Sequence, residues 1–227
     1  MRHHSLMDRI LLIDKPAGMT SHDVVDRVRK VFSTRKVGHA GTLDPFATGL
    51  LIVGVGDATK RMQTYVGLDK TYEATARLGA TSDTYDPEGT ITDVPRTSYQ
   101  VPGTKYEVPT HSDVERVLDK FRGGYDQKAP LHSAKKIGGK KLYELARKGT
   151  ATEEMRPIKH VEITELTVTD YTWPNLSFRV RCSSGTYIRS LADDIGRELG
   201  CGAYLTALRR TAIGEHHLED ATRLEDL

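Results

Sequence analysis

The sequence contains few cysteines and no long apolar run. Its two cysteines, Cys182 and Cys201, have neither the spacing of a metal-binding pair nor the number of a secreted disulfide framework. No apolar stretch approaches the roughly 18 residues of a membrane span. Residues 1–12 also lack the hydrophobic core of a signal peptide. We therefore expect two reduced thiols, Cys182 as a small core residue, and a cytoplasmic location away from membranes.

Metal-ligand clusters and nucleotide-binding loops are also missing from the sequence. No group of His, Cys, Asp and Glu has metal-ligand spacing, and no glycine-rich stretch has the Walker pattern. His3 and His4 alone do not make a metal site. We expect no metal and no cofactor, and a nucleoside hydrolase or phosphate-handling enzyme is disfavoured. The 227 residues are enough for one large domain, or for a catalytic core with a small appendage, and for a hydrophobic core that needs no disulfide or metal to be stable.

Charge is nearly balanced overall but unevenly distributed. The formal net charge is +2, yet residues 128–148 hold seven Lys and Arg against the single acid Glu144. A second basic run covers residues 27–36 without any acid, and the C-terminal residues supply the balancing carboxylates. Each basic run suits a phosphate backbone, although a solvated helix face has the same composition.

Strands and helices are indicated by hydrophobic periodicity. Apolar or alternating runs predict strands, and amphipathic runs with caps predict helices. The predicted strands are 9–14, 50–55, 71–78 and 176–182, with Tyr72, Ala74, Ala76 and Leu78 on one face of the third and Leu176, Phe178, Val180 and Cys182 on one face of the fourth. The predicted helices are 20–33, capped by Thr20 or Ser21, 112–123 with a Ser112 to Glu115 capping box, a short one near 141–148, and 187–199, which stops at Gly200.

These elements do not alternate regularly, so we predict an α+β fold with a mixed or antiparallel sheet. No internal repeat is found. Residues 93–111, rich in Pro, Gly, Thr and Tyr, are interpreted as a surface insertion of a single domain, 1–227.

The most informative segment is 37–60, which places Asp44 in a glycine-punctuated loop between a basic segment and an apolar strand. Pro45 biases the backbone of Asp44 to extended conformations, while Gly38, Gly41 and Gly49 permit turns that side chains forbid. Taken alone, this composition is also typical of a turn with an Asx cap.

The same segment resembles the signature loop of the TruB family of tRNA pseudouridine synthases, Gly-His-x-Gly-Thr-Leu-Asp-Pro-x-Ala-x-Gly. Four further motifs of that family match in order, so the resemblance covers the chain from about residue 12 to its end. They are 15–21 (Lys-Pro-Ala-Gly-Met-Thr-Ser), 70–72 (Lys-Thr-Tyr), 185–189 (Gly-Thr-Tyr-Ile-Arg) and 208–211 (Leu-Arg-Arg-Thr). One departure is that the chain ends too early to hold the C-terminal PUA domain common in this family, which affects expected affinity more than chemistry.

The resemblance implies a pseudouridine synthase fold, with a long central sheet flanked by helices and an RNA-binding cleft. It also implies isomerisation of uridine to pseudouridine at conventional position 55 in the T arm of tRNA, with the target base flipped out. Such a reaction retains the uracil and needs one positioned carboxylate without an obligatory second one. We expect tRNA as the partner of a monomeric enzyme.

Site residues carry over from the matching motifs. Asp44 is implied as the essential catalytic residue, with Arg189 as its ion-pair partner, unless Arg189 forms an ordinary surface pair. Tyr72 is implied as a catalytic residue that stacks on the extruded uracil and assists proton removal at the re-bonded carbon, although a core-packed aromatic gives the same pattern. The other implied substrate-binding residues are His39, which would fill the space left in the RNA, Tyr187 as a pocket wall, Lys15 as a support of the site, and Leu208 in the closing motif.

The basic segment 128–148 resembles the RNA-gripping insertion of the family. Its expected RNA-binding residues are Lys135, Lys136, Lys140 and Lys141. Two other functions fit parts of the same pattern: a non-catalytic RNA-binding or RNA-chaperone module, and a guide-RNA-dependent pseudouridine synthase. The joint presence of Asp44, Tyr72 and Arg189 argues against the first. The absent appended domain argues against the second.

Overall fold

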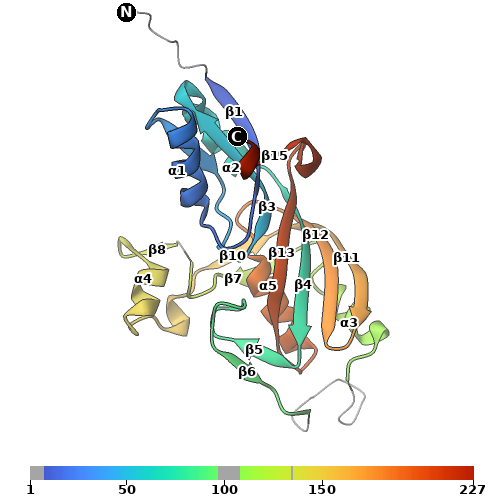
Figure 1. Cartoon of the computed structure of the whole chain (residues 1–227). Helices are drawn as coiled ribbons and strands as arrows, with labels where there is room; N and C mark the ends of the chain where they lie inside the picture. Colours follow the sequence, from blue (N-terminus) through green and yellow to red (C-terminus); the bar gives the residue numbers. More distant parts are fainter. Residues whose placement is uncertain (1–7, 97–107, 134) are drawn as a thin grey trace, which may run out of the picture. The chain divides into compact units, whose positions relative to one another are not determined.

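The computed structural model describes residues 8–96, 108–133 and 135–227, and for residues 136, 137, 140 and 141 only the backbone (Figure 1). The chain forms two compact units, Met1–Glu73 with Leu208–Leu227, and Ala74–Ala207. Strands β4 (Lys70–Leu78) and β13 (Ala203–Ile213) have residues in both units. The expectation of a single domain stays a prediction, as does the cleft.

The main sheet has the strand order β11-β12-β4-β13-β3-β1-β15. In addition, β2 pairs with β3, and β14 pairs with β13. It contains antiparallel pairs, such as β1 with β3 and β11 with β12, and parallel pairs, such as β13 with β3. Helices and strands do not alternate along the chain. The predicted α+β class with a mixed sheet is therefore confirmed.

The first unit is built around strand β3 (Thr48–Val55), which is buried on both faces. The neighbours of β3 include β1 (Arg9–Lys15) and β2 (Val37–Ala40). Side chains of helix α1 (Ser21–Val31) pack with Leu51 and Val53, while Met62 of helix α2 (Met62–Val66) packs with Leu50 and Ile52. Because both faces are covered, the strand reads as a continuous apolar run, as the sequence predicted. The C-terminal part of this unit contains the short strands β14 (His216–His217) and β15 (Thr222–Arg223).

Helix α1 confirms one of the two predicted cap candidates. Thr20 is the N-cap, its hydroxyl accepts from the amide of Asp23 at 3.1 Å, and the Asp23 carboxylate accepts from the Thr20 amide at 2.8 Å. This reciprocal capping box leaves the neighbouring Ser21 hydroxyl available for a tertiary contact.

The second unit contains the remaining helices and strands. Its helices are α3 (His111–Leu118), α4 (Leu142–Arg147) and α5 (Ile188–Glu198). Its strands, besides parts of β4 and β13, are β5 (Ala80–Ser82), β6 (Ile91–Asp93), β7 (Tyr125–Lys128), β8 (Lys136–Ile137), β9 (Lys140–Lys141), β10 (Ile158–Val161), β11 (Ile163–Thr172) and β12 (Asn175–Cys182). The long antiparallel pair β11 and β12 lies at one end of the strand order.

Two predicted elements of this unit are confirmed closely. The predicted inward face of β12, from Leu176 to Cys182, is buried. Helix α5 buries Ile188, Leu191 and Ile195, and the chain leaves it through Gly200 at a φ of +71°. Cys182 is a core residue as expected.

Helix α3 corrects the predicted capping box. Thr110, not Ser112, is the N-cap. The carboxylate of Asp113, not that of Glu115, accepts from the backbone amide of Thr110 at 2.9 Å. Ser112 lies one residue inside the helix, and Glu115 instead forms an ion pair with Arg122 at 2.8 Å. The box begins two residues earlier because a threonine and an aspartate three residues apart satisfy the same geometry.

No helix in the described part of the chain is both long and apolar enough to span a membrane. Of the predicted insertion 93–111, residues 97–107 lie outside the described residues, and so do His3 and His4.

Candidate active site

The loop that carries Asp44 runs from Gly41 to Ala47, between β2 and β3. Asp44 is partly exposed, and its carbonyl accepts from the amide of Ala47 at 3.1 Å, which closes a turn. The sequence interpretation began the loop at Val37. The structure corrects this start, because residues 37–40 form strand β2, so His39 lies on a strand opposite Val53 and not in a loop.

Lys15 binds the backbone of the loop next to Asp44. Its side chain is fully buried, and its ammonium group donates to the carbonyls of Met19 at 2.6 Å, Pro16 at 2.9 Å and Pro45 at 3.3 Å. The amide of Gly18 donates to the same Pro45 carbonyl at 2.9 Å. The motif 15–21 is therefore hydrogen-bonded to the residue that follows Asp44.

Ser21 fixes the other side of Asp44. Its hydroxyl accepts from the amide of Leu43 at 2.9 Å and donates to the carbonyl of Leu43 at 3.2 Å. Ser21 and Leu43 are both buried. Hydrogen bonds to the residues before and after Asp44 restrict the direction in which its carboxylate points.

Arg210 anchors the beginning of the loop. It is 1% exposed; its Nε donates to the carbonyl of Leu50 at 2.8 Å and its Nη2 to the carbonyl of Gly41 at 3.1 Å. Strand β13 approaches β3 so closely here that a Cβ on Gly49 would stand 2.3 Å from the Arg210 carbonyl oxygen. Glycine is required at position 49, where φ is also +102°.

His39 is partly buried, and its Nδ1 has no hydrogen-bond partner among the described residues. Burial, and then the nearby positive charge of Arg210, lower the pKa of His39 below its ordinary value. The ring is consequently held neutral at neutral pH, with one nitrogen available as an acceptor or donor. This state suits stacking and hydrogen bonding to a nucleic acid.

Tyr72 and Leu208 belong to the same unit as Asp44 and lie on β4 and β13. Both side chains are buried, with exposures of 8% and 7%. The face of β4 predicted to point inward, from Tyr72 to Leu78, is buried as expected. Burial agrees with core packing and with a base-stacking surface alike, so both interpretations of Tyr72 stand.

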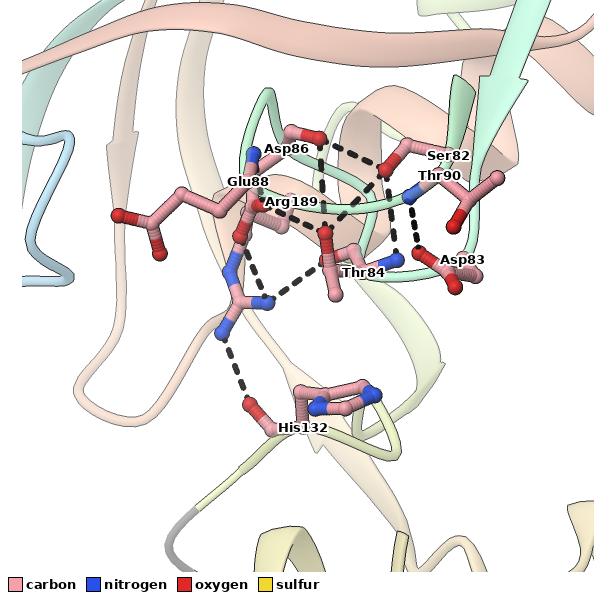
Figure 2. Close-up of polar contacts among 8 residues, drawn as sticks. All are labelled: Ser82, Asp83, Thr84, Asp86, Glu88, Thr90, His132 and Arg189. Carbon is pink, nitrogen blue, oxygen red and sulfur yellow. Dashed lines mark hydrogen bonds and ion pairs between the residues drawn. The ribbon is translucent and has the colours of Figure 1, made fainter. Parts of the chain in front are cut away.

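Arg189, in the other unit, lies in the first turn of α5 within a network of buried polar groups (Figure 2). Its Nη1 donates to the carbonyl of Thr84 at 2.7 Å and pairs with the Asp86 carboxylate at 3.2 Å, and its Nη2 donates to the carbonyl of His132 at 3.0 Å. The side chains of Arg189 and Asp86 are 5% and 4% exposed. The alternative of an ordinary surface pair is therefore wrong, whereas pairing of Arg189 with Asp44 stays a prediction.

Asp86 is itself fixed within a tight loop between β5 and β6. Its Oδ1 accepts from the hydroxyl of Thr84 at 2.5 Å and from the amide of Glu88 at 3.0 Å. Its carbonyl accepts from the hydroxyl of Ser82 at 2.7 Å. Figure 2 shows these bonds around the guanidinium of Arg189. The loop thereby presents one buried carboxylate to one buried cation.

The remaining predicted residues lie in the same unit as Arg189. Tyr187 is the N-cap of α5 and is partly buried. Lys135 is exposed, and Lys136, Lys140 and Lys141 lie on the short strands β8 and β9, where the description covers the backbone alone. Helix α4 follows directly, which confirms the short helix predicted near 141–148. In the described residues, no three His, Cys, Asp or Glu side chains gather as metal ligands would.

From the sequence, Ser21 and Arg210 were named only as members of family motifs, and Asp86 not at all, and none of the three was assigned a role at the site. Asp86 carried a signal, since it precedes a proline as Asp44 does. Arg210 lies among apolar residues and a second arginine, Arg209, and a charged residue that is buried requires partners. Apart from its motif, Ser21 was considered only as a helix cap.

The chain matches the family model of the TruB family pseudouridylate synthase N-terminal domain over residues 29–188. Residues 189–227 match the model of the tRNA pseudouridylate synthase B C-terminal domain. The chain is 46% identical over 222 residues to the tRNA pseudouridine synthase B of Azoarcus sp. (strain BH72), covering 98% of this chain and 70% of that protein. It is 46% identical over 222 residues to that of Syntrophotalea carbinolica, covering 96% and 68%.

Two solved structures are also similar. One is a chain of a Cbf5-Nop10-Gar1 complex, with a TM-score of 0.69 and 30% identity over 96% of this chain. The other belongs to an H/ACA RNP bound to a substrate RNA containing 2'-deoxyuridine, with a TM-score of 0.67 and 27% identity over 99% of this chain. The chain spans about half, 53%, of the length of each of these solved chains.

Proposed function

The chain belongs to the TruB family of pseudouridylate synthases, and we propose that its target is the uridine at conventional position 55 in the T arm of tRNA. It is an enzyme that isomerises uridine to pseudouridine in tRNA, as its relatives are named to do. The observation that carries the proposal is the Asp44 loop. That loop matches the family motif and is held by buried contacts from Lys15, Ser21 and Arg210.

Asp44 acts in this proposal as the group that starts cleavage of the glycosidic bond. A carboxylate can add to the anomeric carbon, remove the 2′ proton, or add to the base. In each route the bond from the anomeric carbon to N1 breaks, the uracil rotates and is joined through C5, C5 then loses its proton, and N1 takes up a proton. Arg189 would keep the carboxylate ionised in a dry pocket, and Tyr72 would stack on the uracil. The buried ion pair of Arg189 with Asp86 would hold the guanidinium in one orientation for this role.

RNA binding in this proposal combines base flipping with contacts to the phosphate backbone. Extrusion of a uridine costs a few kcal/mol, which the neutral ring of His39 would offset by stacking in the vacated space. The ammonium groups of Lys135, Lys136, Lys140 and Lys141 would bind phosphates independently of sequence. Lys15 supports the loop, while Tyr187 and Leu208 would line the pocket. The proposed protein is a monomeric enzyme that acts on tRNA in the cytoplasm.

The test is Asp44→Asn in a tritium-release or carbodiimide-mapping assay on an unmodified tRNA transcript, without metal or cofactor. We expect one modified site, in the T arm, for the original protein and none for the variant. RNA affinity should stay within roughly tenfold, because the change is nearly isosteric and backbone contacts dominate binding. Substantial turnover by Asp44→Asn would refute the mechanism, and binding without any modification would favour the non-catalytic RNA-binding module.

A guide-RNA-dependent synthase is the second candidate, since the similar solved structures include an H/ACA RNP. The same transcript assay separates the two, because modification without any guide RNA is expected only of the stand-alone enzyme.

A further inference from the structure

Gln127 of strand β7 holds the backbone of Tyr187 with both ends of its side-chain amide. Its Oε1 accepts from the amide of Tyr187 at 2.7 Å, and its Nε2 donates to the carbonyl of Tyr187 at 3.0 Å. Gln127 is 2% exposed. A buried amide that binds both backbone groups of one residue fixes the position and the orientation of that peptide segment.

The two bonds to Tyr187 define the orientation of this amide, and a chain of hydrogen bonds agrees with it. The hydroxyl of Tyr125 donates to the Asp194 carboxylate at 2.9 Å, and its oxygen accepts from Nε2 of Gln127 at 2.6 Å. An ionised carboxylate only accepts, so the Tyr125 hydrogen is committed to Asp194 and the Tyr125 oxygen faces a donor. The nitrogen of the Gln127 amide therefore faces Tyr125, which leaves its oxygen for the amide of Tyr187.

The segment held in this way begins helix α5. Tyr187 is the N-cap, and it makes no side-chain capping bond of its own. Arg189 places a cation in the first turn, the end of a helix where a positive charge is disfavoured. The start of this helix depends on tertiary contacts, of which three come from the stretch 127–132: the Gln127 amide on Tyr187, the Lys128 carbonyl on the hydroxyl of Ser190 at 3.0 Å, and the His132 carbonyl on Arg189.

We propose that Gln127 is a positioning residue for pseudouridine formation. It fixes Tyr187 and, through the first turn of α5, the guanidinium of Arg189. The inference rests on the proposed roles of Tyr187 and Arg189. Positioning of this kind acts on the chemical step, because a displacement of about 1 Å in a catalytic group can cost up to a hundredfold in rate.

The experiment compares Gln127→Leu, Gln127→Glu and Tyr125→Phe with Ser177→Ala, a control that removes the hydroxyl contact with Thr75 in the same unit. Steady-state kinetics on tRNA transcript are combined with hydrogen exchange of the peptide 183–191. For Gln127→Leu we expect kcat to fall at least tenfold with KM within threefold, and faster exchange of the Tyr187 amide. Tyr125→Phe keeps both bonds to Tyr187, so its kcat should stay within about threefold.

Gln127→Glu keeps an acceptor for the Tyr187 amide but loses both donated bonds. It should protect that amide from exchange while still lowering kcat, and it carries the test if Gln127→Leu does not fold. Unchanged exchange at residues 183–191 in Gln127→Leu would overturn the inference. So would a loss of kcat in Gln127→Leu or Gln127→Glu that is no larger than that of Ser177→Ala at matched melting temperature. Failure of the proposed function is distinguishable, because the original protein would then modify no tRNA while the exchange comparison still tests the contact.

Discussion

Arg210 and Gly41 are joined by a hydrogen bond of 3.1 Å from a guanidinium that is almost completely buried. The same guanidinium binds the Leu50 carbonyl, so one side chain of β13 connects the beginning of the Asp44 loop to the strand that follows it. A planar guanidinium can donate in several directions at once, which an ammonium group on a flexible stem cannot do with the same geometry.

Arg210→Lys should therefore destabilise the protein and disturb the Asp44 loop. We expect a loss of about 2 kcal/mol in the free energy of unfolding, because buried carbonyls lose their partners. Turnover should fall by at least tenfold in the tRNA assay. The matched control is Arg209→Lys, whose side chain is 40% exposed and pairs with Asp14. A partly exposed pair contributes less than about 1 kcal/mol. Equal losses in the two variants would contradict the anchoring role of Arg210.

Asp86→Asn removes the charge that balances Arg189 within the buried network. We expect a loss of roughly 3 kcal/mol in the free energy of unfolding, measured by urea titration, since breaking a buried pair leaves a charge poorly compensated. Turnover should fall together with stability. Asp83→Asn is the control, because Asp83 lies in the same loop, is exposed, and accepts from the amide of Thr90 at 2.8 Å (Figure 2). Full activity of Asp86→Asn would show that the orientation of Arg189 does not depend on this carboxylate.

His39 predicts a dependence of stability on pH. Burial lowers its pKa in the folded state below the ordinary value of 6.5, so the unfolded chain binds more protons in the interval between the two values. The free energy of unfolding is therefore not reduced by His39 above pH 6.5. It decreases as the pH falls below 6.5 toward the lower pKa that His39 has in the folded state. Urea unfolding at pH 7.5 and 5.5 should show a larger loss for the original protein than for His39→Gln. Parallel losses would mean that His39 titrates normally.

Neutralising Lys135, Lys136, Lys140 and Lys141 together should weaken tRNA binding and reduce its dependence on salt. Each lost phosphate contact lowers the slope of log affinity against log salt by about 0.7 to 0.9. Filter binding at several salt concentrations measures the slope, and the melting temperature should change little. An unchanged slope would remove residues 128–148 from the RNA interface.

Periodicity was sufficient for the elements whose burial follows from their own residues. Strand β12 and helix α5 were predicted within one or two residues, because their apolar positions repeat with the period of the element and Gly200 ends the helix. Strand β13 was not predicted, although it supplies Arg210. It carries two adjacent arginines, and only partners distant in sequence make an arginine tolerable in a buried strand.

By itself, the sequence determined the α+β class, the family motifs and the position of Asp44 next to a proline, since these are local properties of residue type and spacing. Only the tertiary structure decided which side chains bind the Asp44 loop and the start of α5. Lys15 and Ser21 reach the Asp44 loop from the motif 15–21, and Arg210 reaches it from strand β13. Asp86 and Gln127 contact the start of α5 from about 100 and 60 positions away in the sequence. Such contacts form between segments that only folding brings together, so no local pattern records them.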